Sequence, residues 1–329
     1  MAQLRVRSHR LDKILADGAE SWWSVYHRDP QATPFQRPNW IEPWWRCFAD
    51  QYEAGTVLSV HGSGNEVVAV LPLVLDADGT AIAAPQHLSD YSGWVLSPSV
   101  SAAEAAAALL SALRSDGVTR LKLPDLAYDS SLAAALAACP GMDRSSGEVC
   151  PQIAVAGSWD EYWCDRSGNL RSSVSRAFRR SDRDTHTVFE PDPDERQLRS
   201  FVTLHLRWWR ERDRSSLLEY PRIAAFLTEI GPAMRGSGVL VLSSARSRSR
   251  TEASFLLIEE RGTRYYYQSA IEPDAAESQP GLRHLTEVVQ HTFGAGFSCL
   301  DLLRGAERYK VQFSTEVRTN IDVSVELQL

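Results

Sequence analysis

The sequence of 329 residues lacks several features that would each assign it to a class of protein. It has no run of about 18 consecutive apolar residues, so no membrane-spanning helix and no membrane partner are predicted. Residues 1–7 contain no apolar stretch of the secretory type, so a cytoplasmic location is expected. The five cysteines form no Cys-x-x-Cys pair, so the sequence indicates reduced thiols rather than a zinc site or a disulfide framework.

Familiar catalytic signatures are missing as well. There is no Gly-x-Ser-x-Gly segment, so the sequence indicates no covalent nucleophile. His284 and His291 are not accompanied by a His-Glu-x-x-His pattern or clustered carboxylates, so no metal is expected. Residues 62–65 form a glycine-containing turn, but no Lys-Ser/Thr follows it. We therefore predict a β-hairpin at this turn rather than a phosphate-binding loop.

Charge and composition narrow the remaining classes of protein. The chain has 35 basic and 42 acidic residues, a formal net charge of −7, which excludes a generally basic nucleic-acid packager. Hydrophobic residues make up 43% of the sequence and charged residues 23%, so it can bury sizeable cores and is not a disordered protein. At roughly 150 residues per domain, the length predicts about two domains.

Strand and helix patterns alternate along the chain, which predicts the α/β class with mixed sheets. The predicted strands of the first half cover residues 56–60, 67–75 and 118–123, and its helices cover residues 102–113 and 131–138. In the second half we expect strands at 239–243, 252–260, 263–270 and 322–327, and helices at 201–209 and 282–293. We expect a domain at 1–155, a basic helical connector at 156–200, and a domain carrying the active site at 201–329.

The predicted connector is rich in arginine. Between Arg166 and Ser181 there are several arginines and no acidic residue. On a helix, the spacing of the arginines at 176, 179, 180 and 183 places them on one face. Such a face is either simply solvated or binds phosphates or a polynucleotide. Arginines at residues 246–250 form a second basic segment, at a predicted hairpin tip.

Four blocks of the sequence resemble the CelD-type acyltransferases, which belong to the GNAT and FemAB-like group. The blocks are Phe-Gln-Arg-Pro-Asn-Trp at 35–40, Ser-Asp-Tyr-Ser-Gly at 89–93 and Leu-His-Leu-Arg-Trp at 204–208. The most specific is residues 301–310, which is similar to the family's Asp-x-x-Arg-Gly-x-x-x-Tyr-Lys element. The resemblance covers residues 33–313 and implies tandem GNAT-like domains, with the better active-site elements in the second.

The resemblance also implies transfer of an acyl group to an amine, by direct attack. The donors known in the wider group are acyl-coenzyme A and aminoacyl-tRNA. The turn before the predicted helix at 282–293 would hold the donor pyrophosphate on the backbone N–H groups of Gly281, Leu282 and Arg283. This turn departs from the family's loop because it has a single glycine and a proline, Pro280. A simple turn at the start of a helix is therefore the alternative.

Other residues of the family-like blocks are assigned roles by the same resemblance. His205, Asp301 and Asp90 are the candidate catalytic residues, since acyl transfer needs a base near the amine. A strand bulge near residues 268–270 would offer N–H groups to the oxyanion. A structural salt-bridge network is the alternative for the 301–310 block, and a structural role is the alternative for His205. The expected substrate-binding residues are Tyr91, Gln268, Arg304, Tyr309 and Lys310, and Arg176, Arg179 and Arg180 would add to the donor site.

Three functions follow from the sequence. The first is an N-acyltransferase that uses acyl-coenzyme A and a small-molecule or saccharide amine. The second keeps this chemistry but takes the acyl group from aminoacyl-tRNA, with tRNA held by the basic segments. The third is a binding protein that keeps the scaffold and has lost turnover.

Overall fold

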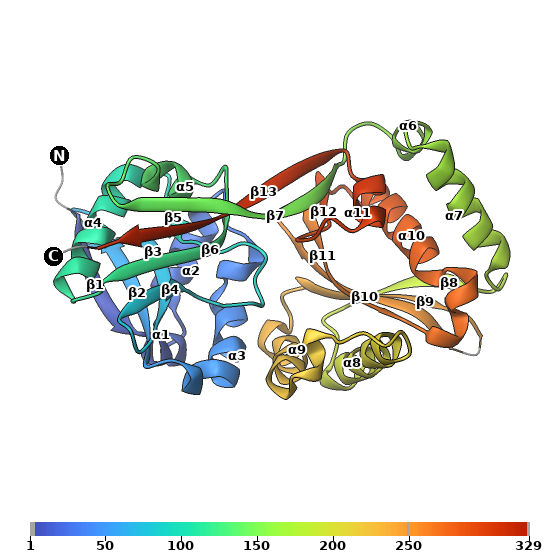
Figure 1. Ribbon diagram of the computed structural model, residues 1–329, viewed down its shortest axis with the longest axis horizontal. Coiled ribbons are helices and arrows are strands. Elements are labelled where there is room, and N and C mark those ends of the chain that lie inside the picture. Colours follow the sequence, from blue (N-terminus) through green and yellow to red (C-terminus); the bar gives the residue numbers. More distant parts are fainter. Residues whose placement is uncertain (1–3, 249, 328–329) are drawn as a thin grey trace. The chain divides into compact units, whose positions relative to one another are not determined.

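The chain forms two compact units, which share two strands. The computed structural model describes residues 4–248 and 250–327 (Figure 1). The first unit comprises Met1–Glu148 and Arg318–Leu329, and the second comprises Val149–Val317. Both boundaries fall inside strands, β7 (Met142–Ala154) and β13 (Glu316–Glu326). Residues 156–200, expected to connect two domains, thus lie within the second unit, and the last strand contributes to the first.

The first unit is a mixed sheet with helices on both faces. Its strands β1 to β4 pair antiparallel in chain order, β4 pairs parallel with β6, and β6 pairs antiparallel with β13. These strands are β1 (Arg5–Arg10), β2 (Ala54–His61), β3 (Val67–Leu75), β4 (Thr80–Ala83) and β6 (Arg120–Ala127), with β5 (Val95–Leu96) beside β3. Its α-helices are α1 (Leu11–Ala16), α2 (Glu20–Arg28), α3 (Pro38–Phe48), α4 (Ala102–Ser115) and α5 (Ser131–Leu136). The predicted hairpin at residues 62–65 is confirmed as the turn from β2 to β3.

The tryptophans of the first unit fill its core. Trp22, Trp40 and Trp44 are fully buried, and the indole N–H of Trp22 donates to the Gln36 carbonyl at 3.1 Å. A buried indole needs such a partner, because its N–H loses water on folding. These three tryptophans are therefore part of the packing of α2 and α3.

The second unit repeats the strand pattern of the first. Strands β8 to β11 pair antiparallel, β11 pairs parallel with β12, and β12 pairs antiparallel with the end of β7. The strands are β8 (His186–Pro191), β9 (Leu240–Arg246), β10 (Thr251–Glu260), β11 (Thr263–Ile271) and β12 (Cys299–Asp301). The helices are α6 (Trp159–Cys164), α7 (Gly168–Arg180), α8 (Glu195–Arg210), α9 (Pro221–Met234), α10 (Pro280–Gly294) and α11 (Arg308–Phe313).

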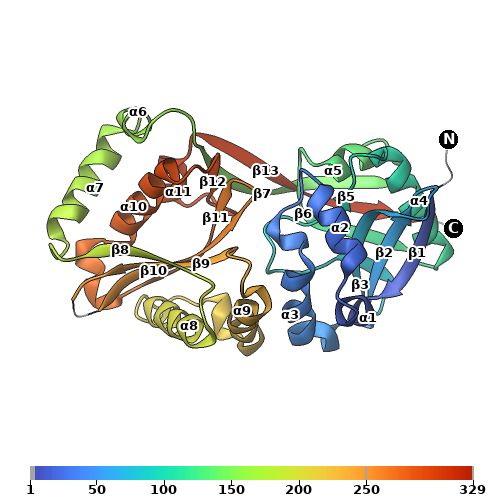
Figure 2. The same ribbon diagram turned by 180° about the vertical axis from the view of Figure 1, so that it is seen from behind.

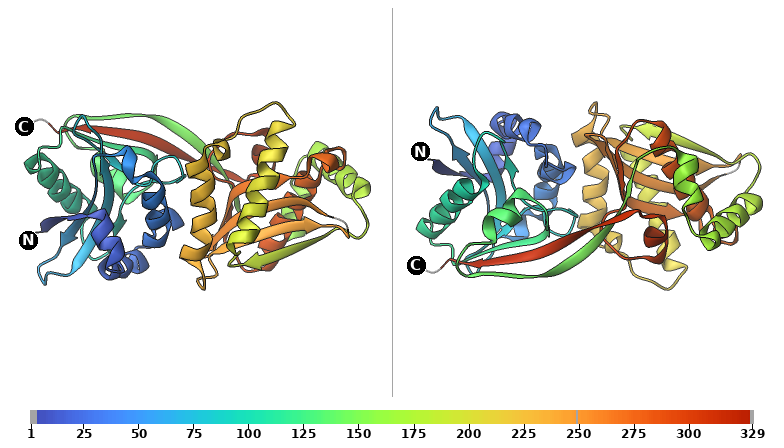
Figure 3. Two further views of the ribbon diagram at one scale, coloured as in Figure 1. Left: turned by 90° about the horizontal axis from the view of Figure 1, so that it is seen from below. Right: turned by 90° about the horizontal axis from the view of Figure 1, so that it is seen from above.

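Helices cover both faces of the second sheet. α8 and α9 lie side by side on one face, whereas α10 and α7 cover the other (Figures 2 and 3). Each helix buries one apolar stripe, such as Leu198, Phe201 and Val202 on α8, because a stripe at this spacing faces the sheet. The predicted α/β class with mixed sheets is confirmed. Among the described residues, no helix has the length and apolar character needed to span a membrane.

Candidate active site

Strand β11 of the second unit is bulged. Leu256 of β10 pairs with Gln268, but the next residue of β10, Leu257, pairs with Tyr266. Tyr267 is therefore an extra residue, and two residues of β11 face one of β10. A bulge of this kind bends its strand and redirects the neighbouring groups, which is why bulges are frequent beside active sites. The predicted bulge thus lies at Tyr267, next to Gln268.

The same strand separates from its other neighbour. The parallel ladder between β11 and β12 covers residues 263–265 and 299–301, and there β12 ends. β11 continues to Ile271, so its last six residues extend beyond this ladder. In open α/β sheets, ligands bind where the carboxyl ends of neighbouring strands diverge. The bulge and the divergence make this end of β11 the candidate reaction centre.

Asp301, the last residue of β12, lies at the point of divergence. Its side chain is buried, and its carboxylate accepts hydrogen bonds from Gln152 Nε2 at 2.6 Å and from the Leu303 N–H at 2.8 Å. The second bond holds the turn that follows β12, in which Leu303 adopts a positive φ of 57°. Asp301 therefore fixes the geometry at the end of β12.

Tyr309 and Lys310 are adjacent on α11 and make different contacts. The Tyr309 hydroxyl bonds that of Tyr266, on β11, and burial raises the pKa of Tyr266 to about 12 and that of Tyr309 further above its ordinary value. Both phenols therefore keep their protons near neutral pH. The Lys310 ammonium is buried, donates to the Arg304 carbonyl and pairs with Glu307 at 3.2 Å. Lys310 thereby holds the turn that contains Arg304.

His205 reaches β11 from α8, on the opposite face of the sheet. Its ring nitrogens lie 2.7 Å from the Ser269 carbonyl oxygen (Nδ1) and 2.8 Å from Ser216 Oγ (Nε2). A carbonyl only accepts, so Nδ1 carries the ring proton, and Nε2 of the neutral ring accepts from Ser216. Burial lowers the pKa of His205, although the bond to Ser269 partly opposes this shift. The ring is therefore a neutral base near pH 7.

α10 follows β11 and a short 3-10 helix, η4 (Pro273–Ser278), and its N-terminus is not capped by a side chain. Its N-cap residue, Gln279, has a φ of 56°, and the first turn contains no acidic residue. The N–H groups of Leu282 and Arg283 both donate to the Gln279 carbonyl, so Gly281 is the one of the three expected donors whose N–H has no backbone acceptor among the described residues. The positive end of the helix dipole and this N–H suit an anion.

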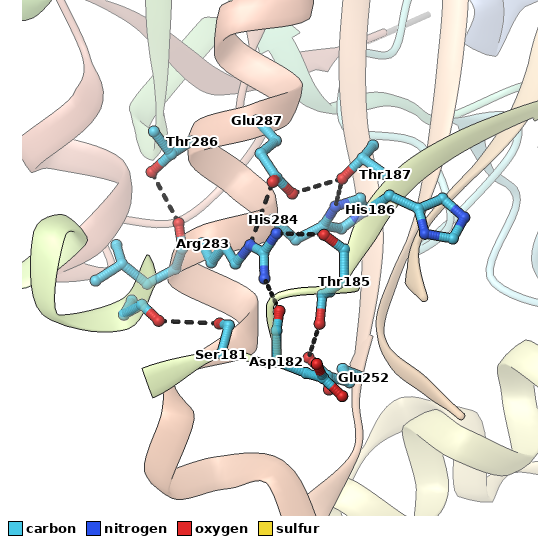
Figure 4. A network of polar contacts seen from close by, with 12 residues as sticks. Ser181, Asp182, Thr185, His186, Thr187, Glu252, Arg283, His284, Thr286 and Glu287 are labelled. Atoms are coloured by element: carbon cyan, nitrogen blue, oxygen red, sulfur yellow. Dashed lines mark hydrogen bonds and ion pairs between the residues drawn. The ribbon is translucent and has the colours of Figure 1, made fainter. Parts of the chain in front are cut away.

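The side chain of Arg283 is held within the protein, and the donor role expected of its backbone N–H stays a prediction. The side chain donates to the Thr185 carbonyl at 2.6 Å and the Asp182 carbonyl at 3.4 Å, and it pairs with Glu287 at 3.2 Å (Figure 4). His284 and Thr187 extend this network, with Thr187 Oγ1 bonding both His284 and Glu287. The network ties the start of α10 to the segment between α7 and β8.

The basic helix α7 packs beside the start of α10. Its buried stripe faces α10, whereas Arg176, Arg179 and Arg180 are exposed. Arg180 donates to the Glu277 carbonyl at 3.2 Å, in the segment just before α10. Among the described residues, none of these three guanidinium groups is paired with a carboxylate. The structure thus brings together the two groups of residues expected at the donor, although they are about a hundred residues apart in the sequence.

The second basic segment, at residues 246–250, is largely neutralised. Arg246 pairs with Glu190, and Arg248 pairs with Asp184 at 2.9 Å. Ser249 lies outside the described residues. Because their charge is already matched, these two arginines contribute less to anion binding than the exposed arginines of α7.

Asp90 and Tyr91 lie in the first unit, in the loop after β4. Tyr91 is buried, its carbonyl accepts from Gln36 Nε2 at 3.1 Å, and the Arg318 guanidinium lies 4.9 Å from its ring centre. The Asp90 carbonyl accepts from Asn320 Nδ2 at 2.7 Å. These contacts hold the loop in the first unit. The expected roles of both residues in substrate binding and catalysis stay predictions.

Sequence reasoning missed Ser216, Tyr266 and Gln152. Ser216 precedes Leu-Leu-Glu, a capping-box pattern that predicts the start of a helical turn. No sequence pattern shows its contact with His205, since that depends on how the segment folds back. Tyr266 sits in a Tyr-Tyr-Tyr run that predicts only a strand, and Gln152 belongs to no motif.

Comparisons with known proteins show what the chain is similar to in sequence and fold. Residues 168–311 match the model of the Acetyltransferase (GNAT) domain. The structure of FemX is 13% identical and similar over 98% of this chain and 97% of that chain, with a TM-score of 0.62. L-PGS from Bacillus licheniformis is 9% identical over 92% and 90%, with a TM-score of 0.59. The C-terminal domain of a putative lysylphosphatidylglycerol synthetase from Agrobacterium fabrum is 11% identical over 94% and 92%, with a TM-score of 0.58. A search of curated proteins gave no match.

These findings confirm the resemblance at the level of the superfamily. The matched GNAT domain runs from α7 to α11 and contains every candidate residue of the second unit. FemX shares the fold over nearly the whole chain. The narrower resemblance to CelD-type acyltransferases stays a prediction.

Proposed function

We propose that the protein is an N-acyltransferase whose reaction centre is the diverging end of β11 in the second unit. One observation carries the proposal: β11 is bulged at Tyr267, separates from β12 after residue 265, and leads into the uncapped start of α10. In this proposal, the acyl carbonyl and the phosphates of the donor bind along one continuous segment. The acceptor amine attacks the carbonyl, the C–N bond forms, and the donor leaves with the electrons of its bond to the acyl carbon.

Acyl-coenzyme A is the donor that we place first. Its pyrophosphate would lie at the start of α10, where the Gly281 N–H and the exposed Arg180 provide a donor and a positive charge. Its thioester would then lie along β11 near the bulge, where redirected backbone groups can stabilise the developing oxyanion. His205, which contacts this strand from α8, is a neutral group that suits proton removal from the amine.

A donor screen by mass spectrometry tests the proposal. The protein is incubated with pools of acyl-coenzyme A or with charged tRNA, each with a panel of small amines and amino sugars. We expect an amide product and free coenzyme A thiol from at least one acyl-coenzyme A. If neither donor class gives a product, the proposed function is wrong. A ligand that raises the melting temperature without any product would favour the non-catalytic binding protein.

Aminoacyl-tRNA is a second candidate donor because of the arginines on α7. Their exposed side chains carry more positive charge than one pyrophosphate requires, and no carboxylate is paired with them among the described residues. We expect Arg176→Glu combined with Arg180→Glu to abolish tRNA binding and its salt dependence, since each lost phosphate contact removes a released counterion. The measurement is the dissociation constant for tRNA from 50 to 200 mM salt, a range in which phosphate-dominated binding changes by orders of magnitude, roughly 10³-fold or more.

A charge-matched variant on α8 is the control for this test. Arg196→Glu combined with Arg199→Glu makes the same change in net charge on an exposed face of another helix. If both variants weaken tRNA binding equally, the attraction is diffuse and α7 is not the binding face. Absent or salt-insensitive binding by the unmodified protein would contradict this donor altogether.

A further inference from the structure

The imidazole of His205 is separated from substrate by the hydroxyl of Ser216. The side chain of His205 is on a residue only 3% exposed, whereas Ser216, in the segment between α8 and α9, is partly exposed. Nδ1 is occupied by the Ser269 carbonyl, and Nε2 by Ser216 Oγ at 2.8 Å. An acceptor amine therefore meets Ser216 before it can meet the ring.

The hydrogen bonds of Ser216 leave one position for a substrate. A serine hydroxyl has one proton and two lone pairs. The proton is donated to Nε2 of His205, because the proton on Nδ1 is already committed to the Ser269 carbonyl. One lone pair accepts the Leu218 N–H at 3.2 Å. The other lone pair is available to accept an N–H from an amine.

The pair is attached to the strand that carries the proposed donor site. Ser269 follows the bulge residue Tyr267 by two positions on β11. Beside Ser216, the side chains of Leu217 and Tyr220 are on residues 59% and 63% exposed and form an apolar rim. A hydroxyl with a free lone pair, on a partly exposed residue next to such a rim, suits an amine that carries an apolar group.

A similar pair in the first unit lacks this access. His61 Nε2 lies 3.0 Å from Ser59 Oγ, and its Nδ1 lies 3.1 Å from the Asn65 carbonyl. Both residues are 5% exposed, and Ser59 Oγ also contacts His9 Nε2 at 3.2 Å. The two pairs have the same hydrogen-bonding pattern. They differ in whether a ligand can reach the hydroxyl.

We infer that Ser216 is a proton relay through which His205 removes a proton from the acceptor amine. This inference rests on the proposed acyl transfer. As the C–N bond forms, the amine N–H proton passes to Ser216 Oγ, and the Ser216 hydroxyl proton passes to Nε2 of His205. The bond from the acyl carbon to the donor then breaks, and its electron pair leaves with the donor thiolate or alkoxide. Ser216 ends unchanged, and His205 carries the proton.

The surroundings of His205 suit the charged ring that this step creates. The Ser269 carbonyl keeps accepting from Nδ1 and favours the positive form. The ring also stacks on Trp209, with ring centres 5.8 Å apart, and an aromatic face attracts a cation. Before the reaction, burial keeps the ring neutral and able to accept a proton.

Steady-state kinetics of the full chain test the relay, with acetyl-coenzyme A and an amine from the donor screen. We expect Ser216→Ala to lower kcat about 100-fold with little change in the KM for the donor, since general-base catalysis contributes roughly 10²–10⁴-fold. Ser216→Thr keeps the hydroxyl and should restore most of kcat. Ser59→Ala is the matched control from the first unit and should leave kcat unchanged.

Nuclear magnetic resonance of the histidine rings gives a readout that needs no turnover. We expect His205 to carry its proton on Nδ1, and Ser216→Ala to shift the Nε2 resonance while the fold and the Nδ1 proton persist. A proton on Nε2 instead would overturn the relay, whatever the activity.

The outcomes separate the relay from the proposed function. Wild-type kcat in Ser216→Ala overturns the relay and leaves acyl transfer standing. An acyl group found on Ser216 by intact-mass and peptide analysis also overturns the relay, because it makes Ser216 the nucleophile. No transfer by the unmodified protein from either donor class overturns the proposed function, and the relay with it.

Discussion

The two units have the same strand order, yet they differ at the position where β11 of the second unit extends beyond its ladder with β12. In the first unit, β4 has four residues and stops at Ala83, soon after its ladder with β6. The place beside β6 is then taken by the following loop, in which Ser92 bridges to Leu126 and donates to the Asp125 carbonyl at 2.9 Å. In the second unit, β11 has nine residues, is bulged, and continues beyond β12.

The helices that follow β4 and β11, which are α4 and α10, also differ at their N-termini. α4 begins at Ser101, whose side chain caps the helix by accepting from the Glu104 N–H, and Glu104 places an acid in the first turn. α10 begins without a side-chain cap and without an acid. A capped, acidic N-terminus satisfies its own N–H groups and repels anions, whereas an uncapped one attracts them. The shared fold alone therefore does not indicate a site, and the proposed site rests on the local departures in the second unit.

The largest effect that we expect is a lower stability of the second unit than of the first in acid. His284 is fully buried in the second unit between Thr187 and Ser243, and burial lowers its pKa to about 3 (Figure 4). Below about pH 6.5, His284 binds a proton in the unfolded chain but not in the folded chain. The contribution of the neutral His284 ring to the free energy of unfolding is therefore largest above that pH. It falls as the pH drops toward 3, by on the order of 3–5 kcal/mol in total.

Urea unfolding at pH 7 and pH 4.5 measures this effect, and hydrogen exchange shows which unit opens first. We expect the second unit to open first in acid, and His284→Gln to reduce the loss of stability between the two pH values. His186→Gln changes an exposed histidine of the neighbouring strand and is the control. Equal pH dependence in the wild type and His284→Gln would contradict the assignment.

The second effect concerns His205 and its counterpart in the first unit, His61. We expect His205→Gln to lower kcat about 100-fold or more, because it removes the proposed base. His61→Gln alters a histidine with similar contacts in the first unit and should leave kcat within a few-fold of the wild-type value. Equal losses in folded, equally stable variants would mean that both histidines act through packing alone.

A smaller effect is expected when an acidic residue is introduced into the first turn of α10 or removed from that of α4. Leu282 is the third residue of α10, the position that Glu104 has in α4. We expect Leu282→Glu to raise the KM for acyl-coenzyme A roughly tenfold, which corresponds to about 1.4 kcal/mol, since an acid there opposes the phosphates. Glu104→Gln should leave this KM unchanged. A KM that responds to neither change would place the phosphates away from α10.

Much of the fold could be read from the sequence because it depends on local patterns. The hairpin at residues 62–65, the alternation of strands and helices, and the basic face of α7 all follow from the order of residues over short windows. The unit boundaries could not be predicted in this way, because β7 and β13 each begin in one unit and pair with a strand of the other. No local pattern reports a pairing between strands about two hundred residues apart.

The candidate site likewise contains residues that the sequence predicted and contacts that it did not. The 301–310 block and the turn before α10 were found as motifs. The side-chain contacts of Arg283 were not predicted because its partners, the carbonyls of Thr185 and Asp182, lie about a hundred residues earlier. The contact between Ser216 and His205 also depends on a fold-back of the chain, here over eleven residues in a segment with no regular pattern.

The pairing of β13 with β6 has a consequence for how the protein is made. β6 of the first unit lacks this neighbour until β13 has formed, and β13 leaves the ribosome about two hundred residues after β6. A nascent chain that ends before residue 318 therefore carries an unprotected sheet edge in its N-terminal half, which is a template for aggregation. Completion of the first unit should thus await synthesis of the whole second unit, and a chain truncated after residue 317 should be poorly soluble even though its second unit is intact.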